Sequence, residues 1–176
     1  MTPLLPLDPS ADAGVAKQLI GAFGERVVEA ELLRRGWVTA NVNASIRNAR
    51  DFDLFAVKKG RSLQIRVKTC SLGEDAQFRT RKNQEITADG VADTDFTIVV
   101  RMGAIREGDQ FYIVPTRVVL NALSAHRTAS LPTQKDTGQW VLRWRELRSG
   151  EAKQNYGFEK KWEQYLNTWD RLDGAV

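Results

Sequence analysis

Charged side chains interrupt a stretch of sequence that otherwise looks like two buried β-strands, DFDLFAVKKGRSLQIRVKTC at residues 51–70. Asp51 and Asp53 belong to the first apolar run, and Arg66 and Lys68 belong to the second. Such residues can form simple surface ion pairs, which contribute little to stability. The apolar residues between them, however, predict that both strands pack on a core, where a charge costs free energy unless it is paired or used. Carboxylates beside cations suit the binding of a divalent metal ion and a phosphate group.

The elements expected around these residues place them on neighbouring strands. The segment KKGR at 58–61 is expected to form the turn, so the two strands should be hairpin partners. Because side chains alternate across a strand, Asp51 and Asp53 are expected on one face of the first strand, and Arg66 and Lys68 on one face of the second. An acidic pair would then lie beside a basic pair.

Helical and strand patterns in the rest of the chain predict an α/β domain. A helix is expected from about Ala16 to Arg35, where apolar residues recur at helical spacing, and Gly36 should end it. Further elements are expected as strands at WVTANVN (37–43), DFTIVVRM (95–102) and QFYIV (110–114), and as a helix from Pro115 to Leu123. Residues 71–94 lack periodicity, and a loop of that length is usually functional or disordered. Together these elements predict a mixed central sheet flanked by helices.

Positive charge is concentrated in the middle of the chain. Residues 47–82 hold ten Lys and Arg against four acids, although the whole chain has a net charge of only +4. A basic cluster favours a polyanionic partner, because neutralising phosphates releases counterions. The residues expected to hold DNA are Arg66 and the cluster Arg79, Arg81 and Lys82. A solvated basic surface is the alternative.

Aromatic residues recur at helical spacing near the C-terminus. Phe158, Trp162, Tyr165 and Trp169 predict one aromatic face of a single helix. Aromatic rings can stack on bases, but docking to the domain or to a second copy is the commoner use of such a face. A homodimer through this helix is therefore one expectation.

The chain is expected to divide into three regions. Residues 1–13 are proline-rich and predicted to be disordered, 14–126 form the α/β core, and 127–176 form a C-terminal extension that carries the aromatic helix.

Composition excludes several other classes of protein. A single cysteine, Cys70, excludes an intrachain disulfide and a thiolate zinc cluster. His126 is the only histidine, and its polar surroundings predict a surface position. The sequence has no phosphate-binding P-loop and no dinucleotide-binding glycine motif. It also lacks an apolar run of membrane-spanning length and a signal-peptide pattern, so a cytoplasmic protein without membrane contact is expected.

The order of four motifs resembles the PD-(D/E)XK nuclease superfamily, which includes type II restriction enzymes and archaeal Holliday-junction resolvases. The motifs are GAFGE in the helix, GWVTANVN, DFDLFAV and LQIRVKT, within residues 18–114. The resemblance is strongest to small bacterial members with a G-x-x-G-E helix followed by a D-L strand and a strand ending in Lys-Thr. It implies a restriction-endonuclease-like mixed sheet flanked by helices, with the C-terminal helical extension as an addition.

The resemblance also implies roles for particular residues. Asp53 matches the metal-binding aspartate, Lys68 the lysine that helps to position or deprotonate the attacking water, and Glu25 the helix glutamate. The implied cofactor is Mg²⁺ (or Mn²⁺), with Asp51 as a further candidate ligand. Arg66 departs from the pattern, because it stands where the family has an acid or Gln. This substitution removes a metal ligand and adds a positive charge.

The leading expectation is a Mg²⁺-dependent DNA endonuclease that hydrolyses a phosphodiester with metal-activated water. One alternative is an inactive nuclease fold that serves as a DNA-binding or regulatory module. The second alternative is a protein-interaction module that uses the C-terminal helix.

Overall fold

The computed structural model describes most of the chain. The described residues are 13–42, 52–70, 77–79, 87–103, 108–130, 140–144 and 156–174. The tail predicted at residues 1–13 lies outside them except for Ala13, which begins the first helix. Asp51, Arg81 and Lys82 also lie outside them, so the structure says nothing of their expected roles.

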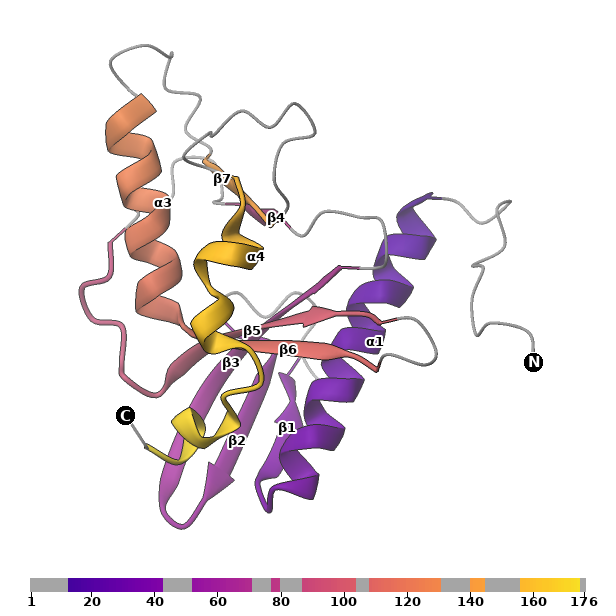
Figure 1. Cartoon of the computed structure of the whole chain (residues 1–176). Coiled ribbons are helices and arrows are strands. Elements are labelled where there is room, and N and C mark those ends of the chain that lie inside the picture. The colour runs from indigo at the N-terminus through magenta and orange to yellow at the C-terminus, as the bar shows by residue number, and fades with distance from the viewer. Residues whose placement is uncertain are drawn as a thin grey trace.

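A five-stranded mixed sheet forms the centre of the fold, with helices on both faces (Figure 1). Its strands, in the spatial order β1-β2-β3-β5-β6, are β1 Val38–Asn41, β2 Leu54–Lys58, β3 Arg61–Cys70, β5 Asp95–Arg101 and β6 Gln110–Pro115. Every neighbouring pair is antiparallel except β3 and β5, which run parallel. The predicted α/β class and flanked mixed sheet are confirmed.

Helix α1 (Ala13–Arg34) follows the predicted span closely and ends at a glycine. Gly36 adopts a left-handed conformation (φ 78°), which glycine reaches without a steric penalty. The Gly36 N–H donates to the Leu33 carbonyl and the Trp37 N–H to the Leu32 carbonyl. This Schellman arrangement satisfies the last carbonyls of the helix and turns the chain into β1.

The hairpin β2–β3 forms at the predicted turn. Lys59 and Gly60 both have positive φ, 48° and 79°, as a two-residue type I′ turn requires. The turn sets the register, in which Lys58 pairs with Arg61 and Leu54 with Ile65.

Two hydrophobic layers lie on opposite faces of the sheet. In the first layer, Val28 and Leu32 of α1 pack on residues such as Ile65 of β3 and Ile98 of β5. In the second layer, α3 (Thr116–Ser130) lies over β5 and β6, with Val119 and Leu123 buried against the sheet. Helix α1 therefore covers one face of the sheet, and α3 covers β5 and β6 on the other.

A second, two-stranded sheet occupies part of the segment predicted to be a loop. Strand β4 (Gln77–Arg79) pairs antiparallel with β7 (Val141–Arg143). The sequence prediction missed both strands, because each has only three residues and each depends on a partner far along the chain.

The predicted single C-terminal helix is wrong. The segment instead forms α4 (Phe158–Lys161) and the 3₁₀ turns η1 (Glu163–Tyr165) and η2 (Trp169–Asp173). Between the two turns, Leu166 is extended and bridges Tyr112 of β6. Asn167, at φ 53°, donates its N–H to the Phe111 carbonyl and accepts the Phe111 N–H through Oδ1. The α-helix thus ends at Lys161, and the chain becomes extended where it pairs with the edge of β6.

The aromatic residues of this segment nevertheless pack on the domain, as expected. Phe158, Trp162 and Tyr165 are buried in the second layer, and Trp169 is buried in the first, with its ring 5.2 Å from that of Phe111. The face expected to support a homodimer is thus used for packing within the chain.

Helix α3 differs from its prediction in length and in the place of its histidine. It runs to Ser130, beyond the expected end, and Pro115 is the last residue of β6 rather than part of the helix. His126 is buried and not at the surface. Its Nδ1 lies 3.2 Å from Ser130 Oγ, and its ring stands edge-on to Trp140 with centroids 5.4 Å apart.

No described helix combines the length and the hydrophobicity that a membrane-spanning helix needs.

Burial lowers the pKa of His126 below its ordinary value, because the charged imidazolium loses hydration inside the fold. The unfolded chain therefore binds the proton more tightly than the folded one. The stabilisation is complete above the unfolded pKa, near 6.5, and is lost as pH falls through the lower folded pKa. We expect urea unfolding to show stability falling between about pH 7.5 and 5, and expect His126→Gln to flatten that slope. An unchanged slope in the variant would contradict this assignment.

Candidate functional site

The candidate site lies where β3 continues beyond the strand that pairs with it. On one side, β2 begins at Leu54, opposite Ile65. On the other side, β3 stays paired with β5 as far as Cys70 and Arg101. The β2-facing edge of β3 therefore needs another hydrogen-bond partner after Ile65.

Asp53 supplies that partner with its side chain. It lies in a bend immediately before β2, one residue short of the strand position predicted for it. Its N–H donates to the Ile65 carbonyl (2.8 Å), and its Oδ2 accepts the N–H of Val67 at 2.7 Å. The Val42 N–H donates to the Asp53 carbonyl at 2.9 Å. Two bonds hold the Asp53 backbone and one holds its carboxylate, so the carboxylate lies along β3 just beyond the start of β2.

Lys68 faces the same region from β3. Strand alternation places Arg66 and Lys68 on one face, opposite the buried Ile65 and Val67, as the sequence predicts. The pKa of Lys68 lies below its usual value, chiefly because burial disfavours the ammonium ion and secondly because Arg66 is close. The carboxylates of Asp53 and Glu25 act in the opposite direction. The structure therefore brings Asp53 and Glu25 each within electrostatic reach of Lys68.

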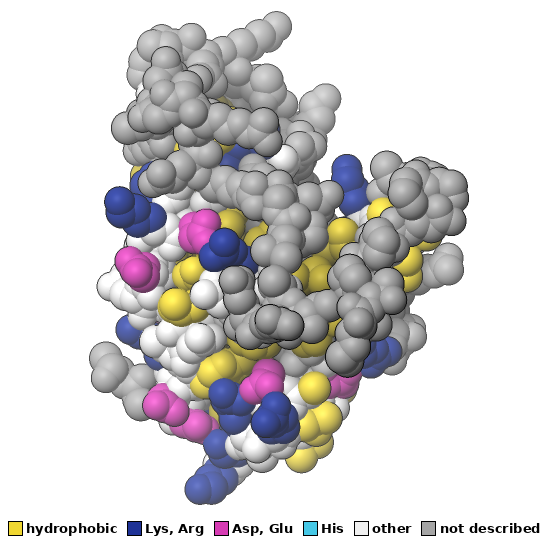
Figure 2. Space-filling model, turned by 45° about the vertical axis from the view of Figure 1, so that its right-hand side comes forward, with side chains coloured by type: hydrophobic (Ala, Val, Ile, Leu, Met, Phe, Trp, Pro, Cys, Tyr) yellow, Lys and Arg dark blue, Asp and Glu magenta, His cyan; other side chains and the backbone are white. Residues whose placement is uncertain are grey.

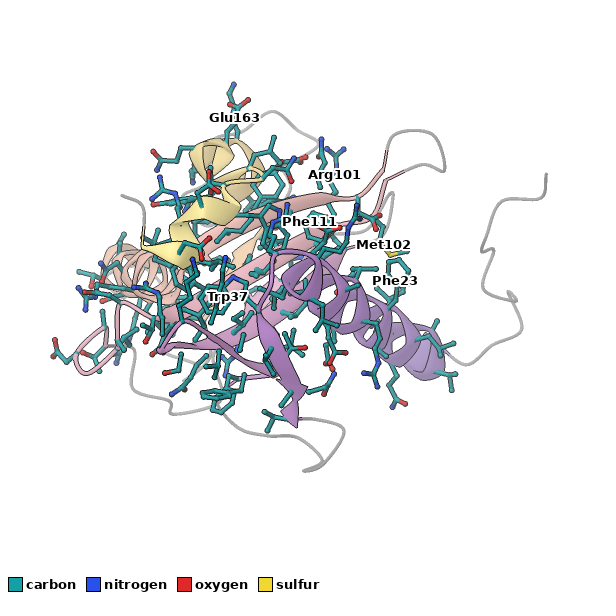
Figure 3. All side chains as sticks on the ribbon, turned by 90° about the horizontal axis from the view of Figure 1, so that it is seen from below. Phe23, Trp37, Arg101, Met102, Phe111 and Glu163 are labelled. Carbon is teal, nitrogen blue, oxygen red and sulfur yellow. The ribbon has the colours of Figure 1, made fainter. Side chains whose placement is uncertain are left out.

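Glu25 reaches the site because α1 lies unusually close to β3. A Cβ on Gly24 would fall 1.8 Å from Thr69 Oγ1, so only glycine fits at this point. In the view of Figure 3, Phe23 of α1 and Met102, the residue after β5, are labelled towards the same end of the sheet, and α1 contacts both β3 and β5. Glu25 Oε2 accepts a hydrogen bond of 3.0 Å from the Asn41 side-chain amide. The helix therefore approaches β3 at Gly24 and is bonded to β1 through Glu25.

The sequence interpretation missed the contributions of Gly24, Thr69 and Asn41. Gly24 belongs to the GAFGE motif, and a glycine inside a helix is itself a signal of close approach. Thr69 Oγ1 is buried and has no hydrogen-bond partner in the described part of the chain. Nothing in the sequence pattern singled out Asn41.

The carboxylates of this region fit a hard divalent cation in number and type. Within the described residues, no group of three or more His, Cys, Asp and Glu side chains is placed to hold a metal ion. Asp53 and Glu25 provide two carboxylates, and Mg²⁺ commonly binds one or two, keeping waters and substrate phosphates as its other ligands.

The face of the sheet that carries Lys68 is only partly covered. Helix α3 lies over β5 and β6, whereas Val38 of β1 and Phe55 and Val57 of β2 have exposed side chains. On the side viewed in Figure 2, Lys and Arg side chains are interspersed with Asp and Glu. On the side that Figure 2 shows, charge alone therefore does not delimit an interface.

The other predicted DNA-binding residues do not all join this site. Arg66 lies next to Lys68 and is half-buried. Arg79 belongs to β4, in the separate two-stranded sheet, where its backbone pairs with Val141. The other two members of its cluster are outside the described residues.

Comparison with known proteins gives a likeness of fold. No family model and no curated protein matches the sequence. Among solved structures, a bacterial homing endonuclease, I-Ssp6803I, superposes with a TM-score of 0.51 at 17% sequence identity. The match covers 89% of this chain and 93% of that one. At this identity the likeness shows a shared fold, so the nuclease-like fold is supported over nearly the whole chain.

Gly24 allows a direct test of what positions α1. We expect Gly24→Ala to lower the free energy of unfolding by about 1–3 kcal/mol, because its Cβ would overlap Thr69. Gly21→Ala is the matched control, since its Cβ meets nothing within 4 Å, and it should stabilise the helix by up to about 1 kcal/mol. Denaturant titration measures both changes.

A second substitution separates this clash from a general intolerance of α1. Thr69→Ala removes the oxygen but leaves its Cβ, which lies 2.9 Å from the position of the added methyl group. It should therefore recover part of the stability lost in Gly24→Ala. If the double variant is no more stable than Gly24→Ala, the contact does not set the position of the helix.

Proposed function

We propose that this protein is a DNA endonuclease that depends on Mg²⁺ or Mn²⁺. The observation that carries the proposal is the carboxylate of Asp53, which accepts the Val67 N–H and, like Glu25, lies within electrostatic reach of Lys68. The order of the sequence motifs and the fold shared with I-Ssp6803I, a homing endonuclease, support the same reading. Its partner would be DNA.

The three residues would have distinct tasks. Asp53 and Glu25 would hold the cation, which, when bound, would neutralise phosphate charge and favour ionisation of water. Lys68 would donate hydrogen bonds to a phosphate oxygen and stabilise the negative charge that develops there. Its lowered pKa would also ease the transfer of a proton to or from water. Asp53 is kept in place by the Val67 N–H, so little reorganisation would be needed when DNA binds.

A DNA-binding module without catalysis is the second candidate. It is favoured by one feature, the cation Arg66 next to Lys68, where the nuclease pattern has an acid or Gln. A positive charge there would oppose metal binding and could instead clamp a phosphate with two parallel hydrogen bonds. The interaction module expected to use an aromatic helix has lost its basis, because that helix is not formed and its rings are buried.

Substitutions at Asp53 and Lys68 test catalysis. We expect Asp53→Asn and Lys68→Met each to reduce metal-dependent cleavage of supercoiled DNA at least about a hundredfold. Asn retains an oxygen that can accept the Val67 N–H, so the fold should survive the loss of charge. Asp93→Asn and Lys17→Met, at exposed positions, are the matched controls. Full activity in either site variant, or equal cleavage in EDTA, would remove these residues from the mechanism.

Arg66 decides between the two candidates. We expect isothermal titration to show weak binding of Mg²⁺ or Mn²⁺ to the native protein. Arg66→Met should bind the ion more tightly, because a like charge is removed, and Arg66→Glu more tightly still, because an oxygen ligand is added. DNA binding should weaken in both variants. If Arg66→Glu binds the ion no better than the native protein, Arg66 does not oppose metal binding at this site.

A further inference from the structure

An exposed apolar surface lies on β1 and β2, on the face of the sheet where α3 contacts only β5 and β6 among the five strands. Val38 of β1 is the direct cross-strand partner of Val57 of β2, and Ala40 is the partner of Phe55. All four side chains are exposed. Partners in an antiparallel pair lie on the same face of the sheet, so these residues form one continuous surface, the β1–β2 patch.

Apolar residues at these positions depart from the usual pattern of a sheet with one face in water. Antiparallel strands of this kind normally carry polar residues on the solvated face. Strand β3 follows that rule, since the exposed Ser62 and Gln64 are the partners of Val57 and Phe55. Strand propensity alone would be satisfied equally by threonine. A contiguous exposed apolar surface therefore indicates a binding partner.

The size of the β1–β2 patch limits what that partner can be. Val38, Phe55 and Val57 are 73%, 36% and 37% exposed. At about 150–250 Å² for one fully exposed large side chain, they present roughly 200–350 Å² of apolar surface. A stable interface between two proteins buries about 800 Å² on each partner. The patch by itself is therefore too small to hold a second copy of the chain, and it fits a smaller apolar group.

The β1–β2 patch continues directly into the candidate site. Phe55 is opposite Gln64, and Arg66 is the next residue of β3 on that face. Phe55 and Arg66 are thus diagonal neighbours, which lie about 7–8 Å apart across an antiparallel pair. Lys68 follows Arg66 on the same face. The Phe55 ring lies 6.5 Å from that of Phe52, which packs beside it. An exposed aromatic ring therefore stands one diagonal step from the cations of the candidate site.

We propose that Phe55 stacks on an unpaired base of DNA whose backbone runs past Arg66 into the candidate site. This inference rests on the proposed function and narrows the substrate to DNA with unpaired nucleotides beside the cleaved bond. A base offers an aromatic face joined to a negatively charged backbone, and an exposed ring beside cations suits both parts. Bases inside a continuous duplex stack on one another and must first be unstacked before a protein can contact their faces.

Binding to two single strands of equal length and charge tests the stacking. One strand is oligothymidine, and the other is the same sugar–phosphate chain without bases. Fluorescence anisotropy in EDTA measures both dissociation constants without metal-dependent cleavage. We expect the native protein to bind oligothymidine about tenfold more tightly than the strand without bases. Phe55→Leu keeps an apolar side chain but has no aromatic ring, so it should bind the two strands nearly equally, whereas Phe55→Tyr should retain the preference.

A matched control removes exposed apolar surface from another element. Leu33→Ala, on α1, should leave the preference for oligothymidine unchanged. Equal binding of the two strands by the native protein, the absence of binding, or a preference that survives in Phe55→Leu would each overturn the assignment. A native dimer that Phe55→Leu dissociates in analytical ultracentrifugation would also overturn it, because the β1–β2 patch would then be an interface between copies.

Failure of this inference is distinguishable from failure of the proposed endonuclease. The binding assay contains no free divalent metal ion, so it does not depend on catalysis. A preference for oligothymidine that Phe55→Leu abolishes, in a protein that does not cleave DNA, would support the stacking and refute only the endonuclease. Metal-dependent cleavage by a native protein that binds the two strands equally would refute the stacking alone.

Discussion

The difference in length between β3 and β2 is the constraint on which the candidate site depends. A strand that continues past its neighbour leaves backbone groups that need partners, and here the Asp53 carboxylate accepts one of them, the N–H of Val67. The same continuation carries Lys68 beyond the start of β2, next to that carboxylate. Parallel pairing of β3 with β5 keeps this end of the strand in the sheet, although β2 no longer supports it.

Close contact between α1 and β3 brings Glu25 to the candidate site. Gly24 lets the helix approach Thr69, and the next residue, Glu25, then projects towards Lys68 and Asn41. Leu32 and Val28, further along the helix, bury the opposite face of β3 in the first layer. The contacts that form the core therefore also fix the distance between α1 and β3.

The C-terminal segment joins both layers of the fold. Leu166 and Asn167 cover the edge of β6, which would otherwise present unpaired backbone groups to other chains. Before Leu166, Trp162 packs against Phe78 of the two-stranded β4–β7 sheet. After Asn167, Trp169 and Leu172 belong to the first layer. The C-terminal segment therefore packs against both the β4–β7 sheet and the central sheet.

Local patterns in the sequence determined the elements whose partners are near along the chain. The α1 periodicity with Gly36, the Lys59–Gly60 turn and the alternation around Arg66 and Lys68 predicted the helix, the hairpin and the face of β3 correctly. Tertiary structure determined the other features, because the contacts that produce them join residues far apart in the sequence. The expected aromatic helix ends at Lys161 and the chain then pairs with β6 through Asn167, and His126 is buried with its ring against Trp140. The approach of Glu25 and Asp53 to Lys68 likewise required the sheet and helix to assemble, since no local spacing specifies how closely two elements pack.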